Sequence, residues 1–418
     1  VTGAVGWRYC SEYMYADSII WGFTQTHLNG TGCMDLGDIL VMPFTGERHR
    51  TWDAYRSSFS KTSENATPGY YTVTLDQAKV KAELTATTHA ALHRYTYEQA
   101  DSASILIDLQ HGPAWNEKQY HSQVNSCEVN WENDSTLTGH VNNKVWVDQD
   151  YYFVMQFSRP VIDHFELPMA ETEKGKRLVA SFNIQPGEEV LMKVALSTTG
   201  VEGAKANMAA EVPGWDFEGI RTAAKADWNS YLSRIEVEGT DEEKTNFYTS
   251  FYHALIQPNE ISDVDGRYRN AADSVVNATG GKFYSTFSLW DTYRAAHPFY
   301  TLMVPERVDG FINSLVDQAE VQGYLPIWGL WGKENFCMVA NHGVSVVAEA
   351  YAKGFRGFDA ERAFNAIKQT QTVSHPLKSN WENYMKYGYF PTDLTEAESV
   401  SSTLESVYDD YAAADMAK

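Results

Sequence analysis

The hydrophobic period of the chain changes once, near Pro213, and this change limits the possible folds more than any other feature. Before it, apolar and polar residues alternate, as in Tyr71–Leu75 and Val80–Ala86. A period of two is typical of half-buried β-strands. After it, apolar residues recur every three or four positions, which is the period of an amphipathic helix. The sequence therefore predicts a β region followed by an α region.

The β region contains further apolar runs bounded by turn residues, at Ile105–Leu109, Tyr151–Phe157 and Val190–Leu196. Many short strands separated by turns favour antiparallel sheets, most simply a β-sandwich. A chain of 418 residues is too long for one ordinary core, so more than one domain is expected. We assign the β-sandwich to residues 1–212.

Residues 213–238 are predicted to form a linker helix with apolar positions from Phe217 to Ile235. Residues 239–418 are predicted to be helical. A first helix is capped by Asp241 and ends before Pro258. Later helices follow at Pro305–Gln322, His342–Lys353, Asp359–Gln371 and Ser399–Ala417. Helices joined by loops rich in aromatic and acidic residues indicate an α/α array with its site at one rim.

The formal net charge of −22 argues against binding to nucleic acid or to an anionic membrane surface, because like charges repel. No apolar run approaches 18 residues, so no membrane span is expected. The surplus of carboxylates fits a secreted protein or one that binds a divalent cation. Four scattered cysteines leave a Cys10–Cys33 disulfide open and favour buried free thiols.

The candidate site combines the stretch Phe283–Ile327 with the loop Trp328–Asn335. It contains Trp290, Asp291 and Arg294, and the loop adds Glu334. Aromatic planes beside carboxylates suit a pocket for sugar rings, and a carboxyl group desolvated there has the raised pKa that a general acid requires. The alternative is an aromatic core, with Glu334 in a surface loop beside Lys333.

Other candidate residues each have a structural alternative. Asp291 and Arg294 are three residues apart and could clamp vicinal hydroxyls, or form an ordinary surface ion pair. His27 lies in a glycine-rich loop, which either carries function or is a simple turn. Glu398 and Glu405 are seven apart on one helical face and are hard ligands suited to Ca²⁺. A contiguous calcium loop is missing, although Asp263–Gly266 resembles the beginning of one.

Taken together, these motifs resemble glycoside hydrolase family 92. The resemblance extends in order along the chain, through Gly6–Cys10, Thr24–Cys33, Asp35–Asp38, Phe247–His253, Asp263–Tyr268, Leu289–Arg294, the Glu334 loop and Glu398–Glu405.

The resemblance implies a calcium-dependent, inverting, exo-acting α-mannosidase, with a β-sandwich followed by an (α/α)6 toroid. It implies that Glu334 is the general acid and that Trp290 and Asp291 contact the terminal mannose. Glu398 would contact the sugar beyond the scissile bond, and Glu405 would be a calcium ligand. Trp7 and His27 would reach the cleft from the β domain.

The sequence also departs from the family pattern. Lys333 and Asn335 replace the asparagine and threonine usual on either side of the acid. The aspartate-rich motif of the general base would follow Lys418, and the start of the family would precede Val1. We therefore expect a truncated chain with an incomplete toroid and without its base.

Two alternatives to the mannosidase remain open. One is a relative that cleaves a mannose phosphodiester, and the other is a non-catalytic carbohydrate-binding fragment. For each reading the expected partner is a mannose-containing glycan, and the expected location is secreted, periplasmic or at the cell surface.

Overall fold

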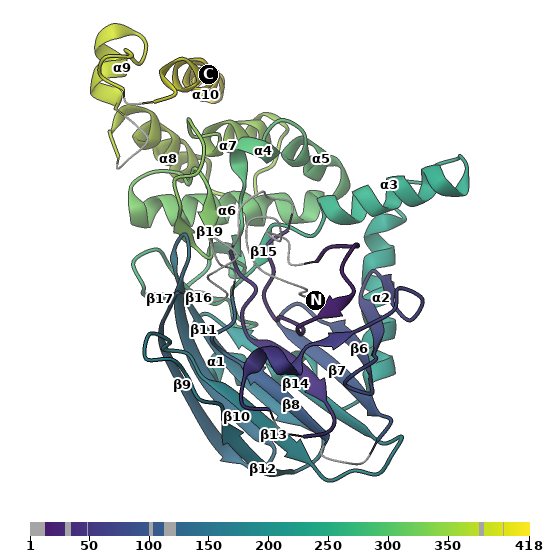
Figure 1. Cartoon of the computed structure of the whole chain (residues 1–418). Coiled ribbons are helices and arrows are strands. Elements are labelled where there is room, and N and C mark those ends of the chain that lie inside the picture. Colours follow the sequence, from purple (N-terminus) through teal and green to yellow (C-terminus); the bar gives the residue numbers. More distant parts are fainter. Residues whose placement is uncertain are drawn as a thin grey trace. The chain divides into compact units, whose positions relative to one another are not determined.

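The computed structural model describes residues 13–29, 35–47, 49–99, 103–112, 123–375, 380–395 and 397–418 (Figure 1). Trp7, Cys10 and Cys33 therefore lie outside the described residues. The chain divides into two compact units, residues 1–235 and residues 236–418.

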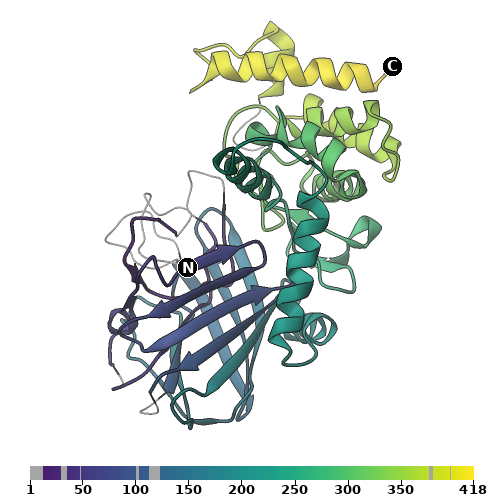
Figure 2. The same cartoon turned by 90° about the vertical axis from the view of Figure 1, so that its right-hand side faces the viewer.

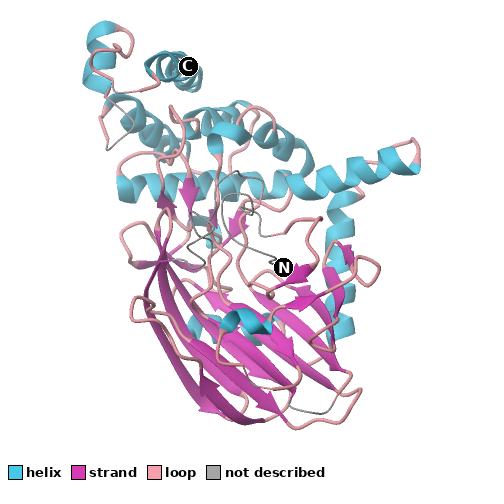
Figure 3. Cartoon of the chain, in the orientation of Figure 1, coloured by secondary structure: helices cyan, strands magenta, loops and turns pink. Residues whose placement is uncertain are grey.

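Unit 1 is built on two antiparallel sheets (Figure 3). The larger sheet has the strand order β4 (Asn65–Thr67), β5 (Tyr70–Leu75), β6 (Val80–Ala86), β7 (Ala90–Tyr97), β14 (Glu189–Ser197), β11 (Asp148–Phe157), β10 (Thr136–Lys144) and β9 (Gln123–Asn133). The smaller sheet has the order β12 (Val161–Glu166), β13 (Arg177–Phe182), β8 (Ala103–Asp108) and β2 (Leu40–Phe44). The short strands β1 (Ile19–Ile20) and β3 (Ser57–Ser58) form a separate pair, and η2 (Trp52–Tyr55) is a turn of 3₁₀ helix.

The two sheets share a core, as the alternating pattern predicts. Phe157 of β11 and Phe182 of β13 bring their ring centroids to 5.3 Å. In β7, Tyr95 and Tyr97 are fully buried, and the Tyr97 hydroxyl donates to the Ser104 carbonyl of β8 at 3.1 Å. All five predicted strands are present, and no end differs from the prediction by more than three residues. The antiparallel β region is confirmed.

Two helices pack on the larger sheet of unit 1. Helix α1 (Val201–Glu211) buries Ala204 and Met208 against Leu92 and Val154. Helix α2 (Phe217–Leu232) contacts the same sheet, and the Arg221 guanidinium lies 3.7 Å from the centroid of the Tyr70 ring (Figure 2). The helix predicted as a linker is therefore part of unit 1, and the boundary between the units follows Ile235.

Unit 2 is mainly helical, as the period of the sequence predicts. Its helices are α3 (Asp241–Ala254), α4 (Leu289–Thr292), α5 (Ala296–Met303), α6 (Pro305–Gln322), α7 (Gly343–Ala352), α8 (Ala360–Thr372), α9 (Trp381–Tyr387) and α10 (Ser399–Met416). Helix α6 has the predicted bounds, because Pro305 occupies its first turn and Gly323 ends it in the left-handed conformation, φ 92°.

The predicted cap of α3 is wrong by one residue. Thr240 is the N-cap, and it forms a reciprocal capping box with Glu243, whereas Asp241 is the first helical residue. Among the described residues, no helix is both long and apolar enough to cross a membrane.

Candidate active site

A tight hairpin presents Glu334. Strands β19 (Gly329–Leu330) and β20 (Lys333–Glu334) pair antiparallel. Trp331 and Gly332 connect them with φ values of 52° and 79°, as in the two-residue turn whose twist suits a hairpin. At Gly332 an added Cβ would lie 3.2 Å from the Arg269 carbonyl oxygen. Positive φ and close backbone contact both explain a glycine here.

The same hairpin is joined to the stretch that carries Trp290. The Phe287 N–H donates to the Gly329 carbonyl at 2.8 Å, and the Gly332 N–H donates to Ser285 Oγ at 2.8 Å. Gly329 thus pairs with Phe287 and also with Glu334. The structure therefore brings together the two parts of the predicted site.

The Glu334 carboxyl group is held by main-chain N–H groups. Oε2 accepts from Ile327 at 2.6 Å, and Oε1 accepts from Trp328 at 3.1 Å and from Phe336 at 2.7 Å. The residue as a whole is half-buried. Desolvation of the carboxyl group raises the pKa of Glu334, while these N–H bonds lower it, and the raised direction prevails.

The surroundings of Glu334 are aromatic. The pKa of the Tyr324 phenol is raised first by burial and then by the charge of Glu334. The centroid of the Tyr324 ring lies 6.2 Å from that of Phe336 and 4.1 Å from that of His375, on which it stacks. Lys333 turns to Asp273, with Nζ 2.6 Å from Oδ1. The neighbouring ammonium group is thereby engaged elsewhere.

The turn of the hairpin and the loop after it are conformationally strained. Trp331, Phe336, Met338 and Ala340 all have φ between 52° and 71°. Non-glycine residues rarely adopt this region, and such residues cluster at functional sites. Thr286, in the adjoining stretch, has φ 66° although it is β-branched.

The residues of α4 and of the turn after it have separate partners. Asp291 Oδ2 accepts from the Ser288 hydroxyl. Arg294 donates to the Trp290 carbonyl, lies 4.2 Å from the centroid of the Trp290 ring and pairs with Glu405 at 3.3 Å. Trp290 Nε1 is buried and has no hydrogen-bond partner within the described ranges, which leaves a donor for a ligand. Asp291 and Arg294 thus engage different partners, and the clamp on vicinal hydroxyls stays a prediction.

Glu405 belongs to a network that the sequence did not reveal. Its carboxylate accepts from the Tyr293 hydroxyl at 3.1 Å and lies 3.0 Å from His342 Nε2. His342 is 1% exposed, stacks on Tyr293 at 3.8 Å and contacts Asp409 through Nδ1 at 3.0 Å. Glu405 and Asp409 are four residues apart on α10, and this spacing is the signal that could have suggested a shared partner.

The other predicted residues are more scattered. Glu398 precedes α10 in the left-handed conformation, φ 58°, with an exposed side chain. His27 is half-buried in unit 1. The cysteines predicted as buried free thiols are represented by Cys127 and Cys337, which are free and half-buried.

The side chains were tested for a calcium site. The described residues contain no group of three or more His, Cys, Asp or Glu that could hold a metal ion. Both oxygens of Glu405 already face Tyr293, Arg294 or His342. The described carboxylates and imidazoles therefore do not by themselves form a site for the expected ion.

Comparison with solved structures finds close likenesses. An α-mannosidase of family GH92 from Bacteroides thetaiotaomicron, in complex with mannoimidazole, has 35% sequence identity and a TM-score of 0.91 over 99% of this chain and 56% of that one. A GH92 inverting mannosidase from the same organism has 27% identity and a TM-score of 0.86, over 99% of this chain and 58% of its own. This chain thus spans rather more than half the length of these proteins.

These relatives fit the expected architecture of a β-sandwich followed by a helical toroid. The comparison with curated proteins gives no match. Residues 1–197 match the glycosyl hydrolase family 92 N-terminal domain, and residues 203–418 match the glycosyl hydrolase family 92 catalytic domain. The chain therefore belongs to glycosyl hydrolase family 92.

Proposed function

We propose that this protein is an exo-acting, inverting α-mannosidase, which hydrolyses terminal α-linked mannose from glycans such as N-glycans or mannans outside the cytoplasm. The observation that carries the proposal is the Glu334 carboxyl group, with its raised pKa, in an aromatic loop of a family 92 chain. The relative solved with mannoimidazole supports mannose as the sugar.

In this proposal Glu334 donates a proton to the leaving glycosidic oxygen. Oε1 accepts two N–H bonds and Oε2 accepts one, so Oε2 has the spare capacity for a proton. Transfer of that proton accompanies cleavage of the bond between the anomeric carbon and the oxygen. An inverting reaction also needs a second carboxylate, roughly 6.5–9.5 Å away, to activate water on the opposite face. We assign no described residue to that role.

The sugar would be held mainly by α4. Asp291 is exposed and presents its carboxylate to solvent, and the Trp290 N–H is available as a donor. Arg294 covers the Trp290 ring and is itself fixed by Glu405, so it orients the indole. Glu398, Trp7 and His27 remain proposals from the resemblance.

The direct test is the anomer that the protein releases first. With an α-mannobiose as substrate, ¹H NMR of the early reaction should show β-mannose accumulating before mutarotation forms the α-anomer. If α-mannose appears first, the reaction retains the anomeric configuration, and the proposed inversion is wrong. No release from any α-mannobiose or mannan would contradict the proposed activity.

Dependence on calcium is a proposal that rests on the resemblance alone, because the described side chains do not by themselves form a calcium site. The proposed mechanism therefore does not depend on the ion. If Glu405 is a ligand, bound Ca²⁺ would either use a remaining lone pair of the carboxylate or displace one of its partners, Arg294 or His342. EDTA should then lower mannose release and the melting temperature, and added Ca²⁺ should restore both. Mg²⁺ is the control, since it prefers a smaller octahedral site. If EDTA changes neither the rate of mannose release nor the melting temperature, the calcium proposal is wrong.

A further inference from the structure

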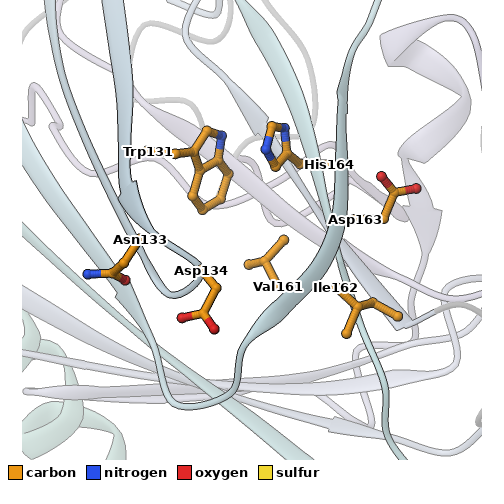
Figure 4. Close-up of a pocket in the computed structure, with 7 residues that line it drawn as sticks. All are labelled: Trp131, Asn133, Asp134, Val161, Ile162, Asp163 and His164. Carbon is orange, nitrogen blue, oxygen red and sulfur yellow. The ribbon is translucent and has the colours of Figure 1, made fainter.

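A cavity of about 420 Å³ opens in unit 1, at the edge of the β-sandwich (Figure 4). It lies where the turn between β9 and β10 meets the beginning of β12. Ligand pockets commonly measure about 300–1,000 Å³. Its lining includes Trp131, Asn133, Asp134, Val161, Ile162 and His164.

The chain fixes the shape of this cavity through its backbone. The Val161 N–H donates to the Asp134 carbonyl at 2.7 Å, and the Phe157 N–H donates to the Ser135 carbonyl at 2.9 Å. Asn133 Oδ1 accepts from the Ser135 N–H at 2.9 Å, which closes the turn. The cavity is therefore preformed.

A β-bulge directs one side chain outward beside it. The pairing of β12 with β13 shifts between Val161 and Asp163, which leaves Ile162 out of register and 64% exposed. Strands β9 and β12 are the edge strands of their sheets, where bulges often lie beside binding sites. An exposed aliphatic surface thus adjoins the polar turn.

The cavity also has uncommitted polar groups. Trp131 Nε1 is buried without a hydrogen-bond partner in the part of the chain that the structure describes. Asn133 and Asp134 bond Ser135 through their Oδ1 atoms, and for these described residues Asn133 Nδ2 and Asp134 Oδ2 remain available. The exposed turn therefore offers a donor, on Asn133, and an acceptor, on Asp134.

An aromatic pair completes the wall. Trp131 and His164 stack with centroids 4.8 Å apart and planes at 19°. This contact joins β9 of the larger sheet to β12 of the smaller one. Figure 4 shows both rings on one side of the cavity, with Asp134 and Val161 opposite.

We propose that this cavity binds one pyranose unit of a neutral glycan, as a second sugar site that does not take part in catalysis. A sugar hydroxyl donates and accepts, so the hydroxyls of one ring can bond both Asn133 and Asp134. The C–H groups of the ring contact the aromatic and aliphatic wall. The Asp134 and Asp163 carboxylates repel an anionic ligand.

A small organic cation is the competing occupant, because carboxylates and rings also attract ammonium groups. It would leave the Asn133 donor unpaired, and burying an unpaired donor costs free energy. The balance of donors and acceptors thus favours the neutral sugar. A second site that holds the same polymer would raise the local concentration of chain ends near the enzyme. This last consequence rests on the proposed function, whereas sugar binding itself does not.

The test follows the indole N–H signal of Trp131 by NMR in the ¹⁵N-labelled 418-residue chain. Trp131→Phe assigns that signal by removing it. Titration with methyl α-mannopyranoside should shift the signal in a saturable way. Asp134→Ala, in an exposed turn, should weaken this binding at least about tenfold, equivalent to about 1.4 kcal/mol. Asp148→Ala, an exposed carboxylate on β11, is the matched control and should leave it unchanged.

Three results would overturn the proposal. The Trp131 signal would stay fixed during the sugar titration, or Asp134→Ala would behave like Asp148→Ala, or tetramethylammonium alone would move the signal. Glu334→Gln should not change the Trp131 titration. A chain that binds sugar at Trp131 but releases no mannose would refute the proposed function and leave this site standing.

Discussion

Replacing Glu334 with Gln is expected to lower mannose release from an oligosaccharide by about 10²–10⁴-fold, the usual contribution of a positioned general acid. The amide cannot supply a proton to a sugar leaving group of high pKa. An aryl mannoside with a good leaving group should lose much less, because its oxygen departs without protonation. The measurement is the ratio of kcat/KM for the two substrates in both proteins.

The pH profile gives a second reading of the same variant. Because burial raises the pKa of Glu334, its protonated form persists to higher pH than in water. Oligosaccharide cleavage by the wild type should fall as pH rises through that pKa, and Glu334→Gln should remove this limb. A carboxyl group whose pKa is raised on folding stabilises the folded state while it is protonated. The contribution of Glu334 to folding stability is therefore present at low pH and is lost as the pH rises through its folded-state pKa.

The amide also alters the loop, and this needs its own control. Gln can keep the two N–H bonds to Oε1, but its Nε2 would face the Ile327 N–H, which now donates at 2.6 Å. The melting temperature shows whether the loop survives. Equal loss on both substrates at an unchanged melting temperature would contradict the acid assignment. A mannose phosphodiester cleaved equally well by both proteins would favour the alternative relative, whose leaving group needs little acid help.

Asp409→Ala should be the most damaging substitution for the stability of unit 2. Asp409 is 1% exposed and accepts from the Asn341 N–H at 3.2 Å, His342 Nδ1 at 3.0 Å and Ser345 Oγ at 2.6 Å. Alanine leaves these buried donors unpaired, so we expect a loss of about 3–5 kcal/mol in the free energy of unfolding. Urea denaturation followed by tryptophan fluorescence measures it.

Asp415→Ala is the matched control on the same helix. Asp415 is 51% exposed and pairs with Lys418, so its loss should change stability by less than about 0.5 kcal/mol. Asp409→Asn keeps one acceptor oxygen and should fall between the two. Because His342 also contacts Glu405, the Asp409 variants should weaken sugar binding as well as folding. Similar stability of Asp409→Ala and Asp415→Ala would mean that the network contributes little.

Much of the fold could be predicted from local patterns. The period of two in Tyr71–Leu75 and the proline and glycine flanking Pro305–Gln322 depend only on neighbouring residues, and the structure contains β5 and α6 there. Local patterns could not predict what the helix in residues 213–238 packs against. Amphipathicity shows that α2 has a buried face, but it does not show which surface covers that face. The close contact of Gly69 with Ala224, where an added Cβ would lie 2.9 Å away, is not visible in either segment.

The candidate site shows the same division. Glu334 and Trp290 can be predicted as site residues from the aromatic and acidic composition around them and from the order of the motifs. The partner of Arg294 cannot be predicted in this way, because Glu405 is 111 residues away in the sequence. The i, i+3 spacing of Asp291 and Arg294 predicts that both lie on one helical face. Helix α4 is only four residues long and ends before Arg294, so the spacing does not fix where the Arg294 side chain lies. The sequence predicts His342 only as the start of a helix, because nothing local indicates its contacts with Asp409 and Glu405.

The left-handed residues of the loop that carries Glu334 also bear on how the enzyme could be evolved in the laboratory. Glycine at Phe336, Met338 or Ala340 would relieve an unfavourable φ, and relief of such strain is worth about 1 kcal/mol per position. A selection for heat resistance would therefore tend to recruit these positions. Glycine at position 336 would also loosen the N–H group that donates to the Glu334 carboxyl group. If Glu334 is the acid, as proposed, thermostability and turnover should trade against each other in this loop.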